Sequence, residues 1–516
     1  MAWGQSLGVR DKTIAAKRWR GPVVPPAVTA LALALRLPAL GKSFNGDEIF
    51  SQQCAVKPIG ALLHCVATTD SHPPLYYLLL HGWRLAGSSE VWVRLLSVAL
   101  GVSTCWLIYS IAALVASRRG ALIAAVLAAT SPTLIGISQL ARNYALVTFA
   151  VALSTYLLAR LLRRPNIWGW IGYTAAAAAG LYSFYYAAYA LAAHNAAFAA
   201  AGPHDRRMWR NWAIAQAAVA GLFAPWLRSL ARQIGTVAAD TSCIDTTLRA
   251  GNVISCLTAA VGGVEPFEIL PVRLTSGLPG MVIEGGFAAV GCAVFITWLR
   301  RRDRKMGGAA LMALMMSVAI ALAVAGRIAV GAYLRPSYLA FVSVFGCVLA
   351  GACLERASWK WIVPLAAMGM TVQASRLPAV YAVIEDWRGC AALLEAHVRP
   401  EEQVCALFAG GADYVEWYSL NKVSVQGLPP DELRSDGERD LIRAVKAEHM
   451  PAIARYLTRH GGVWMVWSHI KRGSADRGSG LVKALFARTG YVVQERYLLQ
   501  GVTVEHYVRA GPHAVR

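Results

Sequence analysis

Long apolar runs separated by short polar stretches dominate the first three quarters of the chain. A transmembrane helix needs about 20 mostly apolar residues, and about eleven runs approach that length. We therefore predict a polytopic α-helical membrane protein. The predicted spans are 22–40, 91–115, 120–137, 143–161, 168–182, 184–201, 211–227, 277–299, 309–330, 336–354 and 360–378.

Basic residues mark every second polar stretch. They fill the N-terminal arm, 1–21, and recur as clusters such as Arg163 with Arg164 and Arg300 to Arg302. Cytoplasmic loops carry an excess of Lys and Arg, so these stretches should face the cytoplasm. The alternate stretches, mainly loops 41–90 and 228–276, are long, acidic and poor in basic residues, and should face outward. With an odd number of spans, the chain beyond the last span is outward as well.

The pattern changes over the C-terminal region, 379–516. Apolar runs shorten, and strand-like pieces such as QVCALF and VWMVWSH alternate with helix-like pieces such as DWRGCAALLEAHV. This alternation is typical of a small α/β domain, here extracytoplasmic. The two strand-like runs of VVQERYLLQGVTVEHYV, on either side of Gln500-Gly501, predict a hairpin.

Composition supports the membrane assignment. The 516 residues are 56% hydrophobic and 15% charged, with a mean hydropathy of +0.45, which is too apolar for an ordinary soluble protein. The net charge of +21 does not indicate nucleic-acid binding, because the basic residues cluster at the ends of apolar runs. The first run follows a long basic arm and precedes no small-residue cleavage site, so we expect a retained span, not a signal peptide.

Cysteines are absent from the predicted cytoplasmic loops and occur two by two in the outward segments. Each pair is either a disulfide formed in an oxidising compartment or two inert thiols. No pair has zinc-site spacing, and no motif for a soluble cofactor occurs in a suitable context. The pairs are Cys54 with Cys65, Cys243 with Cys256, and Cys390 with Cys405.

The first outward loop is the main candidate for chemistry. It contains Asp47 and Glu48 in FNGDEIF, and Asp70 and His72 in DSHPPLYYLLLHGW. Carboxylates beside a bilayer are costly to desolvate, so they tend to face a cavity or a substrate. The alternative is a solvated turn with a capping Asp before a helix.

These residues, with Glu90 and Arg94 in SSEVWVRLLSVALG, resemble the GT-C class of integral-membrane glycosyltransferases. The resemblance extends to SQLARNYALVTFAVALSTYLLARLLRR, LYSFYYAAYALAAHNAA, APWLRSLARQIG and YLRPSYLAFVSVFGCVLAG, over about residues 22–355. The chain is similar to lipid A aminoarabinose transferases, rhizobial lipopolysaccharide galacturonosyltransferases and, more distantly, protein O-mannosyltransferases. The resemblance implies transfer of a sugar from a polyprenyl-phosphate donor to a hydroxyl of an envelope lipid, glycan or protein, at the outer face of a bacterial plasma membrane.

Such a transfer has phosphate as its leaving group and needs one base and one phosphate clamp. Asp47 is the candidate base, which deprotonates the acceptor as it attacks the anomeric carbon and inverts it. Glu48 would position the acceptor or hold the Asp47 carboxylate. Asp47, Glu48 and Asp70 could together hold a divalent cation, although we expect no cofactor.

Cations at predicted outer ends of spans are the candidate phosphate ligands. Arg142, Arg335 and His72 fit this role, because Arg donates in a fixed fork to phosphate oxygens. The alternative for the arginines is snorkelling to the interface. Where lipid A aminoarabinose transferases have Lys-Pro, this chain has His72-Pro73.

The remaining candidate substrate-binding residues are Asp70, Tyr144, Tyr185 and Tyr338. Tyr144 and Tyr185, with Tyr182, are alternatively interfacial aromatics. Two other functions stay open. A transporter or lipid flippase would show inverted repeats and charges near mid-bilayer, and a sensor or assembly protein would tolerate replacement of Asp47.

Overall fold

The structure is a computed structural model in which the chain forms two compact units. One, the helical unit, comprises 1–40, 72–230 and 248–382; the other, the α/β unit, comprises 41–71, 231–247 and 383–516. The first part of the predicted outward loop thus groups with the C-terminal region. The residues that the structure describes are 24–202, 205–239, 307–330, 337–358, 360, 364, 371, 374–407, 409–429, 445, 447–468 and 474–510.

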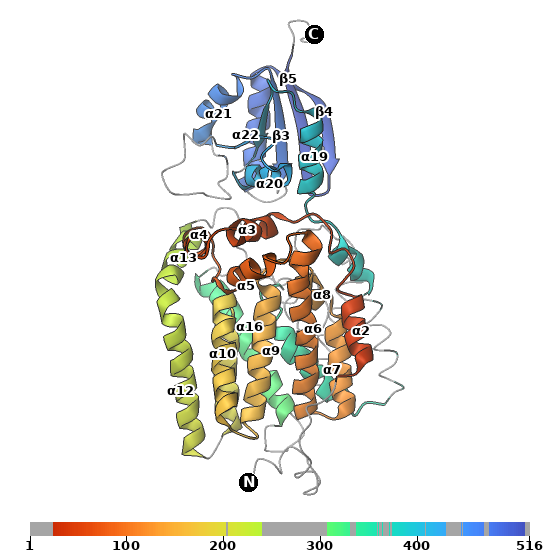
Figure 1. Cartoon of the computed structure of the whole chain (residues 1–516), viewed down its shortest axis with the longest axis vertical. Coiled ribbons are helices and arrows are strands. Elements are labelled where there is room, and N and C mark those ends of the chain that lie inside the picture. Colours follow the sequence, from red (N-terminus) through yellow and green to blue (C-terminus); the bar gives the residue numbers. More distant parts are fainter. Residues whose placement is uncertain are drawn as a thin grey trace. The chain divides into compact units, whose positions relative to one another are not determined.

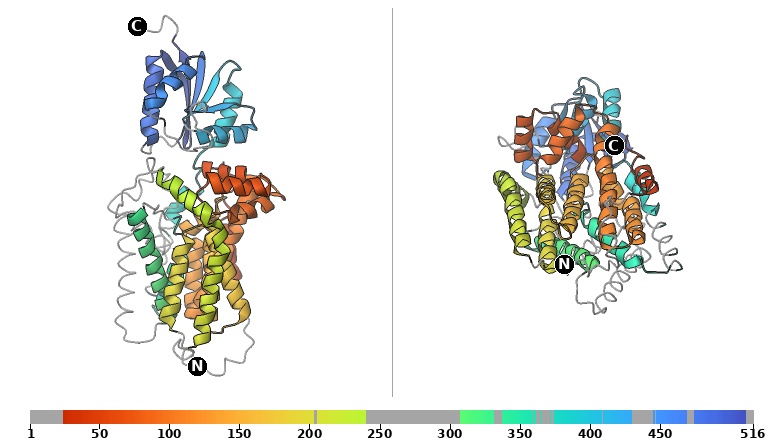
Figure 2. Two further views of the ribbon diagram at one scale, coloured as in Figure 1. Left: turned by 90° about the vertical axis from the view of Figure 1, so that its left-hand side faces the viewer. Right: turned by 60° about the horizontal axis from the view of Figure 1, so that its bottom comes forward.

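The helical unit is built from apolar helices that lie side by side, in both parallel and antiparallel pairs (Figure 1). Helix α9 packs against α6 and α10, α7 against α17, α11 against α16, and α10 against α12, and Figure 2 shows α10 and α12 side by side from further directions. Its helices are α2 (Pro26–Ala34), α5 (Leu75–Arg84), α6 (Glu90–Val115), α7 (Arg118–Thr130), α8 (Pro132–Ser138), α9 (Tyr144–Leu161), α10 (Ile167–Ser183), α11 (Ala187–Ala201), α12 (Arg206–Phe223), α16 (Gly308–Val330) and α17 (Val342–Leu354). The short η2 (Ala224–Trp226) and α13 (Leu227–Ala239) follow α12.

Several predicted spans agree closely with these helices. The span 91–115 corresponds to α6, and 143–161 corresponds to α9. By length and composition, four helices of the described part are able to cross a membrane, or five if the bent pair α7 and α8 counts as one. The count of eleven stays a prediction, because 277–299 and most of 360–378 lie outside the described residues.

The prediction differs from the structure at two places. The loop 41–90 contains three helices, α3 (Gly46–Ala55), α4 (Ile59–Thr69) and α5. They are too short and too mixed in polarity to resemble spans. The span 120–137 is broken at Ser131-Pro132, where α7 and α8 meet at 55°. Proline at the first position of α8 cannot donate the hydrogen bond that would continue α7.

Small side chains let the membrane helices approach closely. The buried face of α7 consists of Gly120 and five alanines. An added Cβ at Gly351 of α17 would collide with the carbonyl oxygen of Gly120. In lipid the hydrophobic effect does not drive helices together, so close packing through small residues stabilises their association instead.

The α/β unit contains a five-stranded mixed sheet of order β2-β1-β3-β5-β4. Strand β1 is parallel to β2 and β3, and β5 is antiparallel to β3 and β4. The predicted hairpin about Gln500-Gly501 is confirmed as β4–β5, with Gly501 at φ 71° in the turn. The strands are β1 (Gln403–Ala406), β2 (Val425–Gly427), β3 (Gly462–Ser468), β4 (Tyr491–Leu499) and β5 (Val502–Arg509), and the helices besides α3 and α4 are α19 (Trp387–His397), α20 (Ala409–Ser419), η5 (Ala447–His449), α21 (Met450–Leu457) and α22 (Ser474–Arg488).

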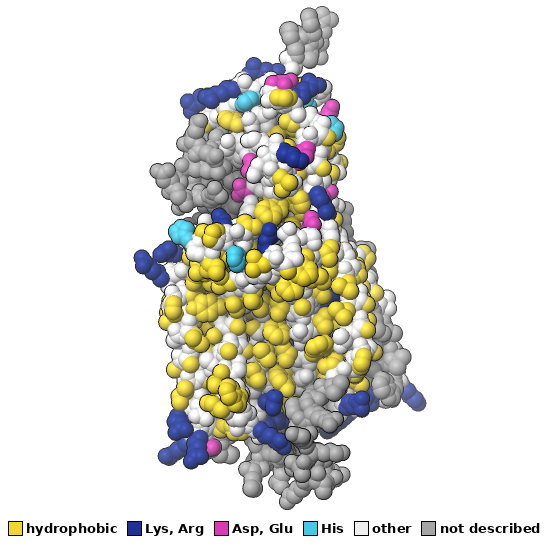
Figure 3. All heavy atoms as spheres, viewed as in Figure 1, with side chains coloured by type: hydrophobic (Ala, Val, Ile, Leu, Met, Phe, Trp, Pro, Cys, Tyr) yellow, Lys and Arg dark blue, Asp and Glu magenta, His cyan; other side chains and the backbone are white. Residues whose placement is uncertain are grey.

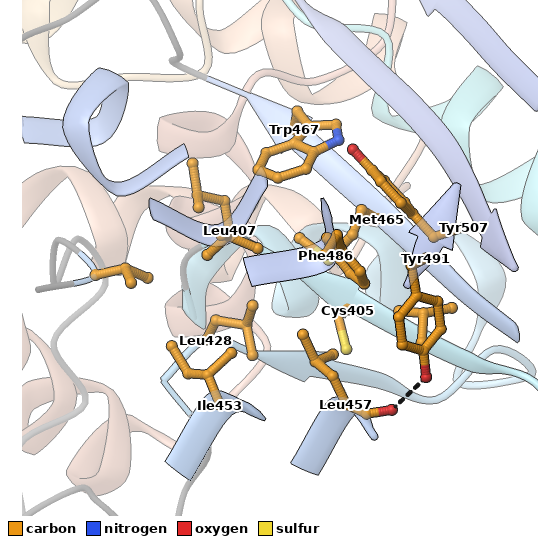
Figure 4. Packing of buried hydrophobic residues seen from close by; sticks show 13 residues of the cluster. Cys405, Leu407, Leu428, Ile453, Leu457, Met465, Trp467, Phe486, Tyr491 and Tyr507 are labelled. Carbon is orange, nitrogen blue, oxygen red and sulfur yellow. Dashed lines mark hydrogen bonds between the residues drawn. The ribbon is translucent and has the colours of Figure 1, made fainter. Parts of the chain in front are cut away.

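One face of the sheet forms a hydrophobic core with α21 and α22 (Figure 4). Met465 and Trp467 of β3 meet Phe486 of α22, whose ring stacks on Tyr507 at 4.0 Å. The Tyr491 hydroxyl donates to the carbonyl of Leu457 at 2.9 Å. Burial of each such side chain contributes about 1.5 to 3 kcal/mol, so the C-terminal region has a core of its own.

Candidate active site

The backbone around Asp47 is fixed at the start of α3. Asn45 caps the helix: its side-chain oxygen accepts a hydrogen bond from the Glu48 amide at 3.0 Å, and the Glu48 carboxylate accepts one from the Asn45 amide at 3.1 Å. This capping box satisfies two amides that a helix start otherwise leaves open. Glu48 is thereby buried at 1% exposure, whereas the neighbouring Asp47 is exposed.

Side chains from the C-terminal region hold the same turn. One carboxylate oxygen of Glu385 accepts from the Gly46 amide at 3.1 Å and from the Trp387 indole at 2.8 Å. The ring of Tyr414 lies against Gly46, where an added Cβ would come within 2.5 Å of it. Glycine is therefore required next to Asp47 by close packing.

Two further contacts extend this support toward the N-terminus. The Tyr418 hydroxyl accepts from the Phe44 amide at 2.7 Å, and the Arg388 guanidinium donates to the Gly41 carbonyl at 2.8 Å. We call residues 44–48 the carboxylate turn. All of these partners belong to the α/β unit. The residues following 383 are thus part of what positions Asp47.

Asp70 ends α4. Its side-chain oxygen accepts from the Ser71 amide at 2.7 Å, and the residue is half-buried. The alternative raised for this loop, an Asp that caps the start of a helix, is not what the structure shows here: Asn45 caps α3, Pro74 precedes α5, and Asp70 follows the last residue of α4. The cap of α3 does not involve the Asp47 carboxylate.

Three predicted substrate-binding residues meet at one end of the helical unit, around Phe184. The His72 ring stacks on Phe184 at 5.3 Å, and Tyr144 and Tyr338 pack edge-on against it at 6.0 and 5.1 Å. Tyr144 and Tyr338 also stack on each other at 5.7 Å. The segments before α5, after α10 and before α17 therefore converge with the first residue of α9 through their rings.

Arg142 lies at the same end, in the turn that precedes α9. It is buried at 4% exposure, and its guanidinium donates to the Tyr77 hydroxyl at 3.3 Å. The neighbouring Asn143 donates to the Ser183 carbonyl of α10 at 2.7 Å, which anchors the turn. Snorkelling is wrong for Arg142, because a snorkelling side chain extends into water. We call His72, Arg142, Tyr144, Phe184 and Tyr338 the arginine–aromatic end.

Basic residues gather at the opposite end of the helical unit. Helix α9 begins beside Arg142 and is followed by Arg163 and Arg164, so its length separates the two groups. Figure 3 shows a broad hydrophobic surface on this unit, with Lys and Arg collected below it. The arginine–aromatic end and this basic cluster therefore lie at opposite ends of the helical unit.

Comparisons with known proteins bear on this arrangement. A family model described as dolichyl-phosphate-mannose-protein mannosyltransferase matches residues 71–228. The structure is similar to ArnT from Cupriavidus metallidurans in the apo state, with a TM-score of 0.59 at 12% identity over 93% of this chain and 97% of that one. ArnT bound to undecaprenyl phosphate gives 0.56 at 12% identity, over 93% and 96%. The chain has the GT-C fold.

AglB from Archaeoglobus fulgidus, in complex with an inhibitory peptide and a dolichol-phosphate, shares this fold with a TM-score of 0.50 at 9% identity, over 93% of this chain and 74% of that one. No curated protein matches. The resemblance predicted from the sequence is thus confirmed for the GT-C fold. The family match includes His72, Arg142 and Tyr144 but leaves out the carboxylate turn and Tyr338.

Tyr185 lies apart from the arginine–aromatic end. Its hydroxyl accepts from the Trp226 indole at 2.8 Å, and its ring packs on Phe223. Tyr182 likewise contacts Phe223 and donates to the Leu222 carbonyl at 2.8 Å. Both tyrosines join α10 to the end of α12, which leaves Phe184 as the residue of this segment that meets His72. Arg335 lies outside the described residues.

Arg36 is a buried cation that the sequence reasoning missed. It is 0% exposed and donates to the carbonyls of Ala128 and Ala129 at 3.2 and 3.0 Å, and to the Ser138 hydroxyl at 3.2 Å. The break between α7 and α8 frees those carbonyls, which would be costly to leave unpaired in lipid. The signal was an arginine within the first apolar run, at a depth where charged residues are rare.

The segment that leaves α8 is tied to the same place. Gln139 donates to the carbonyls of Pro38 and Arg36 at 2.6 and 3.2 Å. Three residues later comes Arg142. Arg36 therefore supports the bend that leads into the arginine–aromatic end, and its loss should disturb the Arg142 turn.

No group of three or more His, Cys, Asp or Glu side chains able to hold a metal ion occurs within the described parts of the chain. Of the three predicted ligands, Glu48 already uses one carboxylate oxygen for the Asn45 amide. Metal dependence stays a prediction to be tested by experiment.

Proposed function

We propose that this chain is a membrane glycosyltransferase that moves a sugar from a polyprenyl-phosphate donor to a hydroxyl of an envelope lipid, glycan or protein. The acceptor oxygen loses its proton to Asp47 and attacks the anomeric carbon. The bond between that carbon and the phosphate oxygen breaks, and its electron pair leaves with the phosphate. The products are a glycosylated acceptor with inverted configuration and polyprenyl phosphate.

One observation carries this proposal: Arg142 is buried beside stacked aromatic rings, at the end of a GT-C fold opposite to Arg163 and Arg164. A guanidinium in a low-dielectric site interacts strongly with phosphate oxygens. Aromatic faces such as those of Tyr144 and Tyr338 suit the apolar face of a sugar ring or an isoprenoid. ArnT, which shares the fold, has been seen with undecaprenyl phosphate.

Asp47 is assigned as base because its carboxylate is exposed on a fixed backbone. A general base must be held in place and still reach the acceptor. Glu48 is assigned a positioning role, because its carboxylate closes the capping box that supports Asp47. His72 and Arg335 complete the phosphate clamp, while Asp70 and the two stacked tyrosines contact the sugar or acceptor.

We place the reaction on the outer side of a bacterial plasma membrane, and without a metal cofactor. A phosphate leaving group departs without protonation, so Asp47 and the arginines suffice. A reporter that is active only outside the membrane should be active after residue 378 and silent near Lys305. The opposite pattern would place the carboxylate turn in the cytoplasm and reject this orientation.

The test is transfer by the purified full chain in lipid nanodiscs. Undecaprenyl-phosphate sugars with a labelled hexose, pentose or aminopentose are mixed with envelope extract, with and without a chelator. We expect label in an acceptor and an equal amount of undecaprenyl phosphate, also with the chelator. A flippase would move the lipid across a vesicle membrane with its glycosidic bond intact. That result, or no transfer from any donor, would overturn the proposal.

A further inference from the structure

Cys54 of α3 and Cys65 of α4 lie in direct contact. Their sulfur atoms are 2.8 Å apart, and Cys54 is 0% exposed whereas Cys65 is partly exposed. Two cysteines can be bridged without backbone movement only where their side chains already point toward each other. The helix pair α3 and α4 meets this condition, and both helices belong to the α/β unit.

The other predicted pair within the described residues differs. Cys390 of α19 and Cys405 of β1 are both buried free thiols, and the described residues show no contact between their sulfur atoms. Cys405 is part of the core that α21 and α22 cover. Cys243 and Cys256 lie outside the described residues. Of the two predicted pairs that lie within the described residues, the geometry therefore favours Cys54 with Cys65.

We propose that Cys54 and Cys65 form a disulfide bond that joins α3 to α4. The carboxylate turn is fixed at the first residues of α3, and this bond would fix the other end of the helix that carries Asp47. A cross-link of this kind also restricts the unfolded chain. The bond requires an oxidising compartment, and so rests on the outward orientation given under the proposed function.

The surroundings favour formation of the bond by thiol–disulfide exchange. The hydrogen bond with Cys54 lowers the pKa of Cys65, and a second contact joins Cys65 to the Thr69 hydroxyl at 3.5 Å. The thiolate is the attacking species. The hydrogen bond with Cys65, and then burial, raise the pKa of Cys54, so Cys65 reacts first.

The reaction consumes one disulfide of an oxidant such as an oxidised dithiol oxidoreductase. The Cys65 thiolate attacks one oxidant sulfur and releases the other as a thiol, which leaves a mixed disulfide. Cys54 then loses its proton and attacks Cys65 Sγ, which releases the second oxidant thiol. The two protein thiols are oxidised, and the oxidant disulfide is reduced to two thiols.

Peptide mapping tests the bond directly. Lys57 precedes a proline, which blocks trypsin, so residues 43–84 remain in one peptide that contains both cysteines. Cells that make the full chain are treated with an alkylating agent before lysis, and the protein is digested without reductant. We expect this peptide without alkyl groups and lighter than the dithiol form by two hydrogen atoms.

The digest contains its own controls. Cys390 and Cys405 should carry the alkyl group once the protein is denatured. In Cys54→Ser the remaining Cys65 should become alkylated, and reductant should restore alkylation of both cysteines in the wild type. Alkylation of both in wild-type protein, even after purified protein is incubated with oxidised glutathione, would overturn the proposal.

A second experiment distinguishes failure of the disulfide proposal from failure of the proposed membrane orientation. If the peptide is dithiol in cells but becomes linked in purified protein with oxidised glutathione, the pairing is supported and the outward orientation is contradicted. Thermal unfolding gives another readout. Reductant should lower the unfolding temperature of the wild type and leave that of a Cys54→Ser, Cys65→Ser double variant unchanged.

Discussion

The carboxylate turn and the arginine–aromatic end hold their functional groups in opposite ways. At the carboxylate turn, backbone amides are bound by Asn45, Glu48 and Glu385, while the Asp47 carboxylate is exposed. At the arginine–aromatic end the side chains hold one another, and Arg142 is buried. Substitution of Asp47 should therefore remove chemistry and leave structure, whereas substitution in the second region should change binding and packing together.

The largest expected effect is that of Asp47→Asn. The amide keeps the size of the carboxylate but cannot accept the acceptor proton, so turnover should fall by about 10² or more. The fold should persist, because no capping hydrogen bond uses this side chain. Label transfer by the purified variant measures the effect. Near wild-type turnover would move the base to Glu48 or Asp70, and full activity in all three carboxylate variants would reject the enzyme assignment.

Arg142→Ala should weaken donor binding by about 10- to 100-fold, the usual range for a lost hydrogen bond to a charged group. Turnover should fall with it, because developing phosphate charge is stabilised most in the transition state. Arg142→Lys should restore only part of the donor affinity and turnover, since an ammonium lacks the guanidinium fork. Arg335→Ala should behave like Arg142→Ala, and Arg335→Lys like Arg142→Lys. Unchanged affinity in both alanine variants would leave the clamp unassigned.

Arg36→Met tests the support of the Arg142 turn. The substitution leaves the carbonyls of Ala128 and Ala129 without their donor, which should cost about 2 to 3 kcal/mol of stability. Thermal unfolding in detergent measures this loss. Arg118→Met, at the exposed start of α7, is the matched control. Equal stability of the two variants would mean that Arg36 does not support the break.

Gly46→Ala should have the smallest effect, confined to the α/β unit. The added methyl group would press on the Tyr414 ring, and overpacking costs about 1 to 3 kcal/mol, so turnover should fall by about fivefold to tenfold. In Gly60→Ala, on α4, the added methyl group has open space and should be neutral. A silent Gly46→Ala would indicate that the turn tolerates displacement.

How far the sequence predicted this structure depends on the range of the interactions. Helices α6 and α9 were placed to within about one residue, because a long apolar run is a local signal. The carboxylate turn was located, but its support was not, because Glu385 lies 339 residues from Gly46 along the chain. No local pattern reports such a contact.

The aromatic residues show the same limit at short range. Tyr144 and Tyr338 were predicted together with Tyr185, yet Phe184 meets both of them and Tyr186 meets Tyr338. Adjacent residues where a helix ends point in different directions, and composition does not reveal which one faces inward. The break at Ser131-Pro132 had a local signal in its proline, whereas the role of Arg36 depends on three helices meeting.

Affinity for undecaprenyl phosphate, measured side by side for the wild type, Asp47→Asn and Arg142→Ala in nanodiscs, tests the central claim most directly. Because Asp47 is assigned proton transfer and Arg142 phosphate binding, we expect wild-type affinity for Asp47→Asn and an affinity lower by about tenfold or more for Arg142→Ala. Weak binding by Asp47→Asn together with wild-type binding by Arg142→Ala would contradict this assignment.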